Sequence, residues 1–102
     1  MRFSFGSGKL QRLYTADAGA ARYPEGIVDA FFDVVATIRA VDNESELYAL
    51  KSFHCEKLKG RRGLLGQYSL RLNKQWRLIF TIQQDRQGRF LRIEEIADYH
   101  KG

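Results

Sequence analysis

Residues 67–82 read QYSLRLNKQWRLIFTI, two short runs of alternating side chains on either side of an NKQ segment at 73–75. The period of two in 68–73 and in 76–82 is typical of β-strands. A three-residue loop at 73–75 pairs the large apolar side chains across the hairpin, all on one face, as burial requires. These pairs are Leu72 with Trp76, Leu70 with Leu78 and Tyr68 with Phe80. We therefore predict a central β-hairpin that the rest of the chain covers.

The same register predicts an arginine pair on the other face of the hairpin, where Arg71 lies directly opposite Arg77. Like charges in this position destabilise a sheet. A bound anion, with phosphate the obvious candidate, would compensate them. The alternative is that the two arginines extend into solvent or pair with Glu94 or Glu95.

The strands around the hairpin are predicted from shorter patterns. Residues 85–88 (DRQG) form a turn, and 90–96 form a last strand in which the Glu94-Glu95 doublet breaks the alternation. A β-bulge there would return Ile96 to the core. Residues 2–5 (RFSF) predict a short edge strand, while the orientation of residues 98–100 stays open.

Two helices are predicted before the sheet. Ser7 is suited to cap a first helix that starts near Lys9, and the YPE segment at 23–25 supplies a start signal for a second. The second helix, of roughly 16 residues, carries one continuous apolar stripe. Its members are Ile27, Phe31, Val34, Val35, Ile38 and Val41. Residues 16–22 read as a loop, and residues 46–50 add one more helical turn.

The chain is expected to turn from helical to extended at Phe53, and residues 57–63 are predicted to form a basic loop. The fold class that follows is α+β, with two N-terminal helices packed on a small, mostly antiparallel twisted sheet.

Length and composition predict one domain over residues 1–102, placed in the cytoplasm. The single Cys55 rules out an internal disulfide framework and fits a reducing compartment. No apolar run approaches the length of a membrane span, and the MRF opening has no secretory signal, so no membrane partner is expected.

Charge is distributed unevenly along the chain, whose net charge is +5. Residues 1–50 carry five basic and seven acidic side chains, whereas residues 51–102 carry twelve basic and five acidic ones. A basic half of this kind indicates a polyanionic partner such as RNA, DNA or an acidic protein.

The sequence contains no phosphate-binding loop, dinucleotide fingerprint or metal-binding cluster, so neither a cofactor nor a metal is predicted. Cys55 beside His54 suggests a thiol nucleophile, but adjacent residues on a strand point to opposite faces, and Cys55 is expected to be a small buried residue. The side chains that remain for chemistry are His54, Lys57, Lys59, Arg61, Arg62, Arg71, Arg77, Tyr99 and His100.

This set suits metal-free cleavage of RNA. Histidine transfers protons near neutral pH, arginine binds phosphate through a planar fork, and tyrosine stacks on an unpaired base. Taken singly, each residue has a plainer interpretation: His54 as a hydrogen-bonded strand residue, and His100 as part of a frayed terminus.

Three segments, FHCEKLKG at 53–60, YSLRLNKQWRLIF at 68–80 and IADYH at 96–100, resemble the HigB-type (killer protein) branch of the RelE toxin superfamily. The resemblance implies the RelE-like microbial RNase fold and the toxin half of a type II toxin–antitoxin system. It implies a ribosome-dependent mRNA endonuclease that acts in the A site without a metal. The implied partner is an antitoxin with a helix-turn-helix domain, which alone contacts operator DNA.

By position, the resemblance implies acid and base roles for His54 and His100, and phosphate contacts for Arg77 and Arg71. Tyr99 would position or stack the base, and Asp98 would orient a histidine. The implied RNA-binding side chains are Lys57, Lys59, Arg61, Arg62 and Arg71. Two other functions stay open: a catalytically weak RNA- or ribosome-binding protein that uses the same basic sheet, and an antitoxin-bound corepressor.

Overall fold

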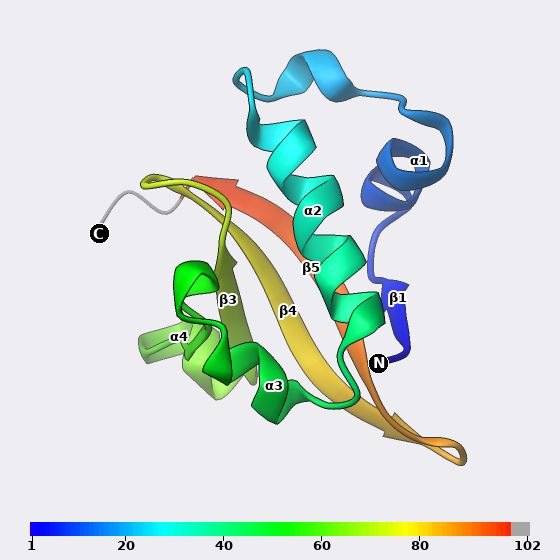
Figure 1. The fold of residues 1–102 in the computed structure, drawn as a ribbon, viewed down its shortest axis with the longest axis vertical. Helices are drawn as coiled ribbons and strands as arrows, with labels where there is room; N and C mark the ends of the chain where they lie inside the picture. The colour runs from blue at the N-terminus through cyan, green and yellow to red at the C-terminus, as the bar shows by residue number, and fades with distance from the viewer. Residues whose placement is uncertain (99–102) are drawn as a thin grey trace.

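A computed structural model describes residues 1–98 of the chain (Figure 1). The strands are β1 (Phe3–Phe5), β2 (Glu56–Lys57), β3 (Gln67–Arg71), β4 (Trp76–Asp85) and β5 (Gly88–Asp98). The helices are α1 (Gly8–Ala16), α2 (Ile27–Ala40), α3 (Glu44–Ala49) and α4 (Gly60–Leu64), with 3-10 turns η1 (Ala20–Arg22) and η2 (Lys51–Phe53). The strands form one sheet in the order β1-β5-β4-β3-β2, antiparallel except for the parallel β1–β5 pair. The α+β prediction is confirmed.

The central hairpin has the predicted register. Leu70 pairs with Leu78, Tyr68 with Phe80, and Arg71 with Arg77. Asn73 closes the loop, because its side-chain oxygen accepts hydrogen bonds from the backbone N–H groups of Gln75 (2.8 Å) and Trp76 (2.7 Å). The short polar loop thus sets the register that burial of the apolar face also requires.

The predicted bulge in the last strand is also present. Ile79 pairs with Glu95 and Phe80 with Ile93, so Glu94 is the extra residue of β5. The extra residue restores the alternation, and Ile96 is buried as expected. β5 is longer than the predicted strand at both ends, because its pairing with β4 continues from Gly88 to Asp98.

The helices differ from the prediction mainly in where they begin. Ser7 caps α1 by accepting from the backbone N–H of Leu10 (3.2 Å), as predicted. α2 begins only at Ile27, because Gly26 has a left-handed backbone (φ 87°) that interrupts helical geometry after the turn at Pro24. α3 begins before the predicted turn, where Asn43 accepts from the N–H of Ser45.

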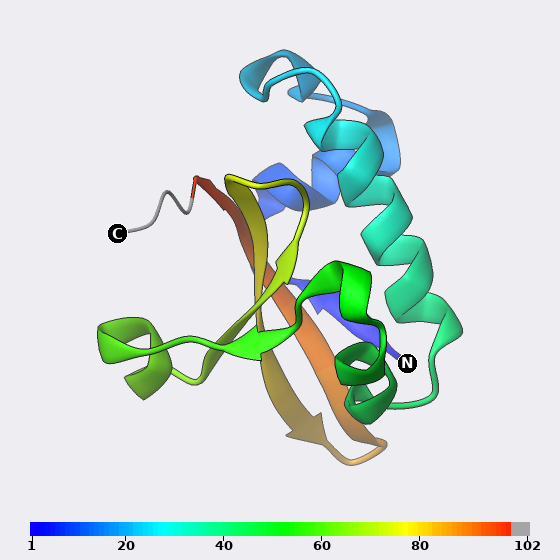
Figure 2. The same ribbon diagram turned by 60° about the vertical axis from the view of Figure 1, so that its left-hand side comes forward.

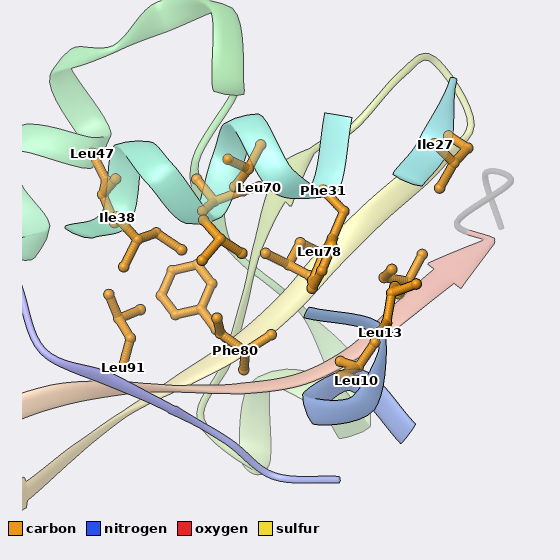
Figure 3. Packing of buried hydrophobic residues seen from close by; sticks show 14 of the residues in the cluster. Leu10, Leu13, Ile27, Phe31, Ile38, Leu47, Leu70, Leu78, Phe80 and Leu91 are labelled. Carbon is orange, nitrogen blue, oxygen red and sulfur yellow. The ribbon is translucent and has the colours of Figure 1, made fainter. Parts of the chain in front are cut away.

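The main core lies between the helices and one face of the sheet (Figure 3). Phe31 and Ile38 of α2 are fully buried against the sheet face that contains Leu78 and Phe80. Each such side chain stabilises the fold by about 1.5–3 kcal/mol through burial. The predicted stripe of the second helix is therefore core throughout.

The second face of the sheet carries a smaller apolar cluster of Leu58, Ile79 and Ala97. Figure 2 shows α2 on one side of the sheet and the short α4 projecting on the other. Leu58 lies two residues before α4, so the connection between β2 and β3 covers part of this face and leaves the rest to polar side chains.

Residues 51–66 are more structured than predicted. The expected extended segment at Phe53 belongs to the η2 turn, and the expected basic loop at 57–63 contains β2 and α4. Three glycines explain the compact path. Gly60 and Gly66 have positive φ values of 66° and 74°, and a Cβ on Gly63 would lie 2.4 Å from the carbonyl oxygen of Leu58. Within residues 1–98, no helix is long and apolar enough to cross a bilayer.

Candidate active site

His54 occupies an unusual backbone position. It ends the η2 turn with φ 46° and ψ 52°, the left-handed conformation, and its N–H donates to the carbonyl of Lys51 (3.1 Å). Non-glycine residues seldom adopt this conformation, and when they do they cluster at functional sites. The plain prediction that His54 is a strand residue is wrong, because β2 begins only at Glu56.

The exposed imidazole of His54 lies against Arg71. Its Nε2 is 3.1 Å from Nη1 of Arg71. A guanidinium has only donors, so Nε2 can take part in this contact only as the acceptor. Nε of Arg71 also donates to the carbonyl of Asn73 (3.3 Å), which holds the guanidinium at the end of β3.

Arg77 contacts the backbone of His54 from the same face of the sheet as Arg71. Its Nη1 is within 3.4 Å of the His54 carbonyl and within 3.4 Å of Oγ of Ser69, which is fully buried. The arginine pair predicted from the register is therefore present, and both members contact His54, one through its ring and one through its backbone.

The carboxylates that were considered as partners of the arginine pair have other contacts. Glu95 accepts from Nη1 of Arg62 (3.0 Å). Glu94 accepts from the hydroxyl of Thr81 (2.9 Å) and lies 3.7 Å from Arg92. Arg71 itself contacts the neutral acceptors described above, and the bound anion stays a prediction.

The predicted RNA-binding residues separate into two groups. Lys57, Lys59 and Arg61 have exposed side chains on β2 and around α4. Arg62 is half-buried and donates to both Gln67 (2.8 Å) and Glu95, so it ties α4 to the sheet. Its first role in the structure is to hold α4 in place.

Asp98 ends β5 apart from the His54 cluster. It pairs with Trp76, whereas its neighbour Ala97 pairs with Arg77, and side chains of adjacent strand residues point to opposite faces. Both carboxylate oxygens accept from Nε2 of Gln75, at 3.0 and 3.1 Å. The structure therefore does not bring Asp98 to His54. The predicted Tyr99 and His100 lie outside the described residues.

Cys55 is not activated as a nucleophile. Burial, reinforced by the charge of Glu56, raises the pKa of its thiol to about 11. No strand is present at residues 54–55, so it is the raised pKa of the thiol, and not the alternation of a strand, that excludes a Cys–His pair. Within residues 1–98, no group of three or more His, Cys, Asp or Glu side chains is arranged to hold a metal ion.

Ser69 is a site residue that the sequence prediction missed. It is a small polar side chain on the arginine face of β3, two positions before Arg71, and it pairs with Ile79. The alternation of the strand places it beside Arg77, and its full burial gives the arginine a fixed partner. A serine between the large side chains of that face was the signal that could have identified it.

Comparison with known proteins gives a consistent result. A family model described as "RelE-like toxin of type II toxin-antitoxin system HigB" matches residues 3–100. No curated protein matches the chain. A solved structure described as "YoeB/ParE toxin from Agrobacterium tumefaciens" is similar with a TM-score of 0.60 and 15% identity, over 98% of this chain and 100% of that one.

At this identity the solved structure supports the fold alone, and the family is established by the family model. That model extends beyond the three segments that carried the resemblance and includes both N-terminal helices. The chain belongs to the HigB-like family of RelE-like toxins of type II toxin–antitoxin systems.

Proposed function

We propose that this toxin is a metal-independent endoribonuclease that cleaves messenger RNA in the ribosomal A site. The observation that supports it best is the 3.1 Å contact between Nε2 of His54 and Nη1 of Arg71, with Nη1 of Arg77 in contact with the His54 carbonyl. One proton-transfer group and two phosphate-binding groups are thus held together by hydrogen bonds on the exposed side of a rigid sheet.

In the proposed reaction, His54 accepts the proton of a ribose 2′-hydroxyl. The 2′-oxygen then attacks the adjacent phosphorus, and the bond from phosphorus to the 5′-oxygen breaks. An imidazole whose Nε2 acts as an acceptor toward Arg71 suits the base role. A phosphate that binds Arg71 would take its guanidinium donors and release the Nε2 lone pair for this proton.

The two arginines would stabilise the charge that develops on the phosphorane. Their planar forks match phosphate oxygens, and the register places them opposite each other across β3 and β4. His100 is proposed as the acid for the departing 5′-oxygen, and Tyr99 as the residue that positions the base, both from the family resemblance. The products would be a 2′,3′-cyclic phosphate or 3′-phosphate and a 5′-hydroxyl.

Membership of a type II toxin family implies an antitoxin partner. The proposal adds that this antitoxin carries a helix-turn-helix domain and makes the contacts to operator DNA. Residues 1–102 would act as a single toxin domain in the cytoplasm, with Lys57, Lys59 and Arg61 in contact with RNA or ribosome.

The test is induced expression of the toxin, followed by mapping of mRNA 5′ ends and of their chemistry. Wild type is expected to produce new 5′-hydroxyl ends within translated codons. Arg71→Lys keeps the charge but loses the fork, and removing such a transition-state donor costs about 10²–10³ in rate. Arg86→Lys makes the same change at an exposed turn residue and should cleave like wild type.

Two results would contradict the proposal. Ends with a 5′-phosphate and a 3′-hydroxyl would indicate attack by water rather than by the 2′-hydroxyl. If wild type and His54→Gln block translation equally, without any cleaved message, the result would favour the non-catalytic binding protein.

Metal removal gives a separate prediction. Toxin treated with EDTA before addition to ribosomes should keep its full activity.

A further inference from the structure

A cleft beside Arg71 has no role in the proposed cleavage. It has a volume of about 240 Å³ and lies between α2, η2 and the end of β3. Its walls include Asp33, Val34, Ser52, Phe53, Arg71 and Leu72. The volume is below the roughly 300–1,000 Å³ of pockets for drug-sized ligands, so it suits a single flat ring.

The polar groups of this cleft are available to a ligand. Asp33 and Ser52 have exposed side chains, and within residues 1–98 neither side chain forms a hydrogen bond or ion pair. Asp33 and Arg71 line the same cleft without pairing with each other. A negative acceptor therefore lies on one wall and a cation on another, with apolar side chains between them.

We propose that this cleft binds one unpaired nucleobase of the RNA, and that Asp33 selects bases with an exocyclic amino group. The proposal rests on the proposed function, because Arg71 would hold the adjacent phosphate. Rings of unpaired bases stack on aromatic side chains and on arginine planes, which Phe53 and Arg71 supply.

The selectivity follows from the chemistry of the carboxylate, which at neutral pH only accepts hydrogen bonds. Adenine, cytosine and guanine each offer an amino donor, and aspartate accepts from such groups. Uracil offers two carbonyl oxygens that the carboxylate repels and one ring N–H. The same negative charge repels phosphate, so the backbone of the RNA would lie on the Arg71 side of the cleft.

Binding of nucleoside 3′-monophosphates to the full chain tests the proposal without any cleavage. Amide NMR shifts are followed in titrations with 3′-AMP, 3′-CMP, 3′-GMP and 3′-UMP, and with inorganic phosphate. The amides of Ala30 and Val34 should shift with the first three and respond about tenfold more weakly to 3′-UMP, the discrimination that one good base contact provides. Phosphate alone should shift only residues near Arg71 and His54.

Matched variants of α2 separate Asp33 from general effects of charge. Asp33→Asn should remove most of the discrimination against 3′-UMP, because the amide offers donor and acceptor alike. Asp29→Asn makes the same change one turn earlier, at an exposed residue that does not line the cleft, and should bind like wild type.

Two outcomes would overturn the proposal: equal shifts with all four nucleotides, or discrimination that survives Asp33→Asn. A third outcome would also overturn it and uses Ala30→Trp, a variant whose added ring fills the cleft. If this variant weakens the antitoxin complex while the nucleotide-induced shifts persist, the cleft is a protein-docking site and not a base-binding site. Nucleotide binding with no cleavage of message would instead refute the proposed function alone. Cleavage without Asp33-dependent selectivity would refute this inference alone.

Discussion

At the scale of single residues, His54 shows how backbone conformation creates the site. Its left-handed backbone turns the chain between η2 and β2 and places the imidazole beside Arg71. If residues 54 and 55 lay in a strand, their side chains would point to opposite faces of the sheet. Instead, a turn exposes His54 and leaves Cys55 half-buried against the main core.

Cys55 gives a prediction about reactivity. Burial raises its thiol pKa from an ordinary value of 9.0 to about 11. At pH 8 the thiolate fraction should therefore be about 100-fold below that of an exposed cysteine. Alkylation by iodoacetamide should be slow in the folded toxin and fast in urea, and Cys55→Ser should leave mRNA cleavage unchanged.

The sign of the stability effect follows from the same pKa. The thiol ionises at lower pH in the unfolded chain, so ionisation favours unfolding as pH rises from about 9 to about 11. The difference in unfolding free energy between wild type and Cys55→Ser should change across this range and stay constant below it. Rapid alkylation of the folded protein at pH 8 would contradict the raised pKa of the half-buried thiol.

At the scale of elements, α4 depends on glycine. Its five residues project from the sheet, and Leu64 and Leu65 at its end are 90% and 61% exposed. Packing of apolar side chains therefore does little to hold this helix. Instead, α4 is held to the sheet by the hydrogen bonds of Arg62 to Gln67 and Glu95. The close approach of Gly63 to the backbone of Leu58 also fixes its position.

Gly63→Ala should loosen this element. The added Cβ would meet a backbone carbonyl at 2.4 Å, which cannot move as a flexible side chain would. Overpacking of this kind costs about 1–3 kcal/mol, measured as the free energy of unfolding in urea. Gly66→Asn is the control, because the space around Gly66 is open and asparagine tolerates positive φ. A larger loss in the control would show that backbone strain, not contact with Leu58, governs this segment.

At the scale of the whole molecule, the two faces of the sheet have different roles. One face is covered by α1 and α2 and holds the main core. The other holds only Leu58, Ile79 and Ala97 as an apolar cluster within residues 1–98 and is otherwise mostly polar. The charge asymmetry of the chain thus becomes an asymmetry of surfaces, because the acidic half mostly forms the helices and the basic half forms the sheet.

RNA binding should therefore depend on salt through the basic segment around α4. For single strands, each phosphate that the protein no longer neutralises reduces the slope of log K against log salt by about 0.7, so a triple change should reduce it by about 2. The variant is Lys57→Gln, Lys59→Gln and Arg61→Gln, tested with an unstructured RNA in a potassium chloride series.

The matched control for this charge removal lies on the helical side. Lys9, Arg12 and Arg39 are exposed basic residues of α1 and α2, and their change to glutamine should leave the slope unaltered. Equal effects of the two triple variants would mean that net charge, rather than the basic segment, determines binding.

The sequence by itself determined the features that depend on burial over short distances. The hairpin register, the Arg71–Arg77 pair, the bulge at Glu94 and the apolar stripe of α2 all follow from periodicity, because a shift by one residue would expose the core. The start of α2 was misplaced because a left-handed glycine outweighed the helix-start signal before it.

Only the tertiary structure decided how separate segments meet. The contact of His54 with Arg71, the separation of Asp98 from that cluster and the cleft at Asp33 all depend on residues far apart in the chain. Local patterns carry no information about the turn geometry and packing that create such contacts. That is why alternation alone could place the arginines but not the histidine that contacts both of them.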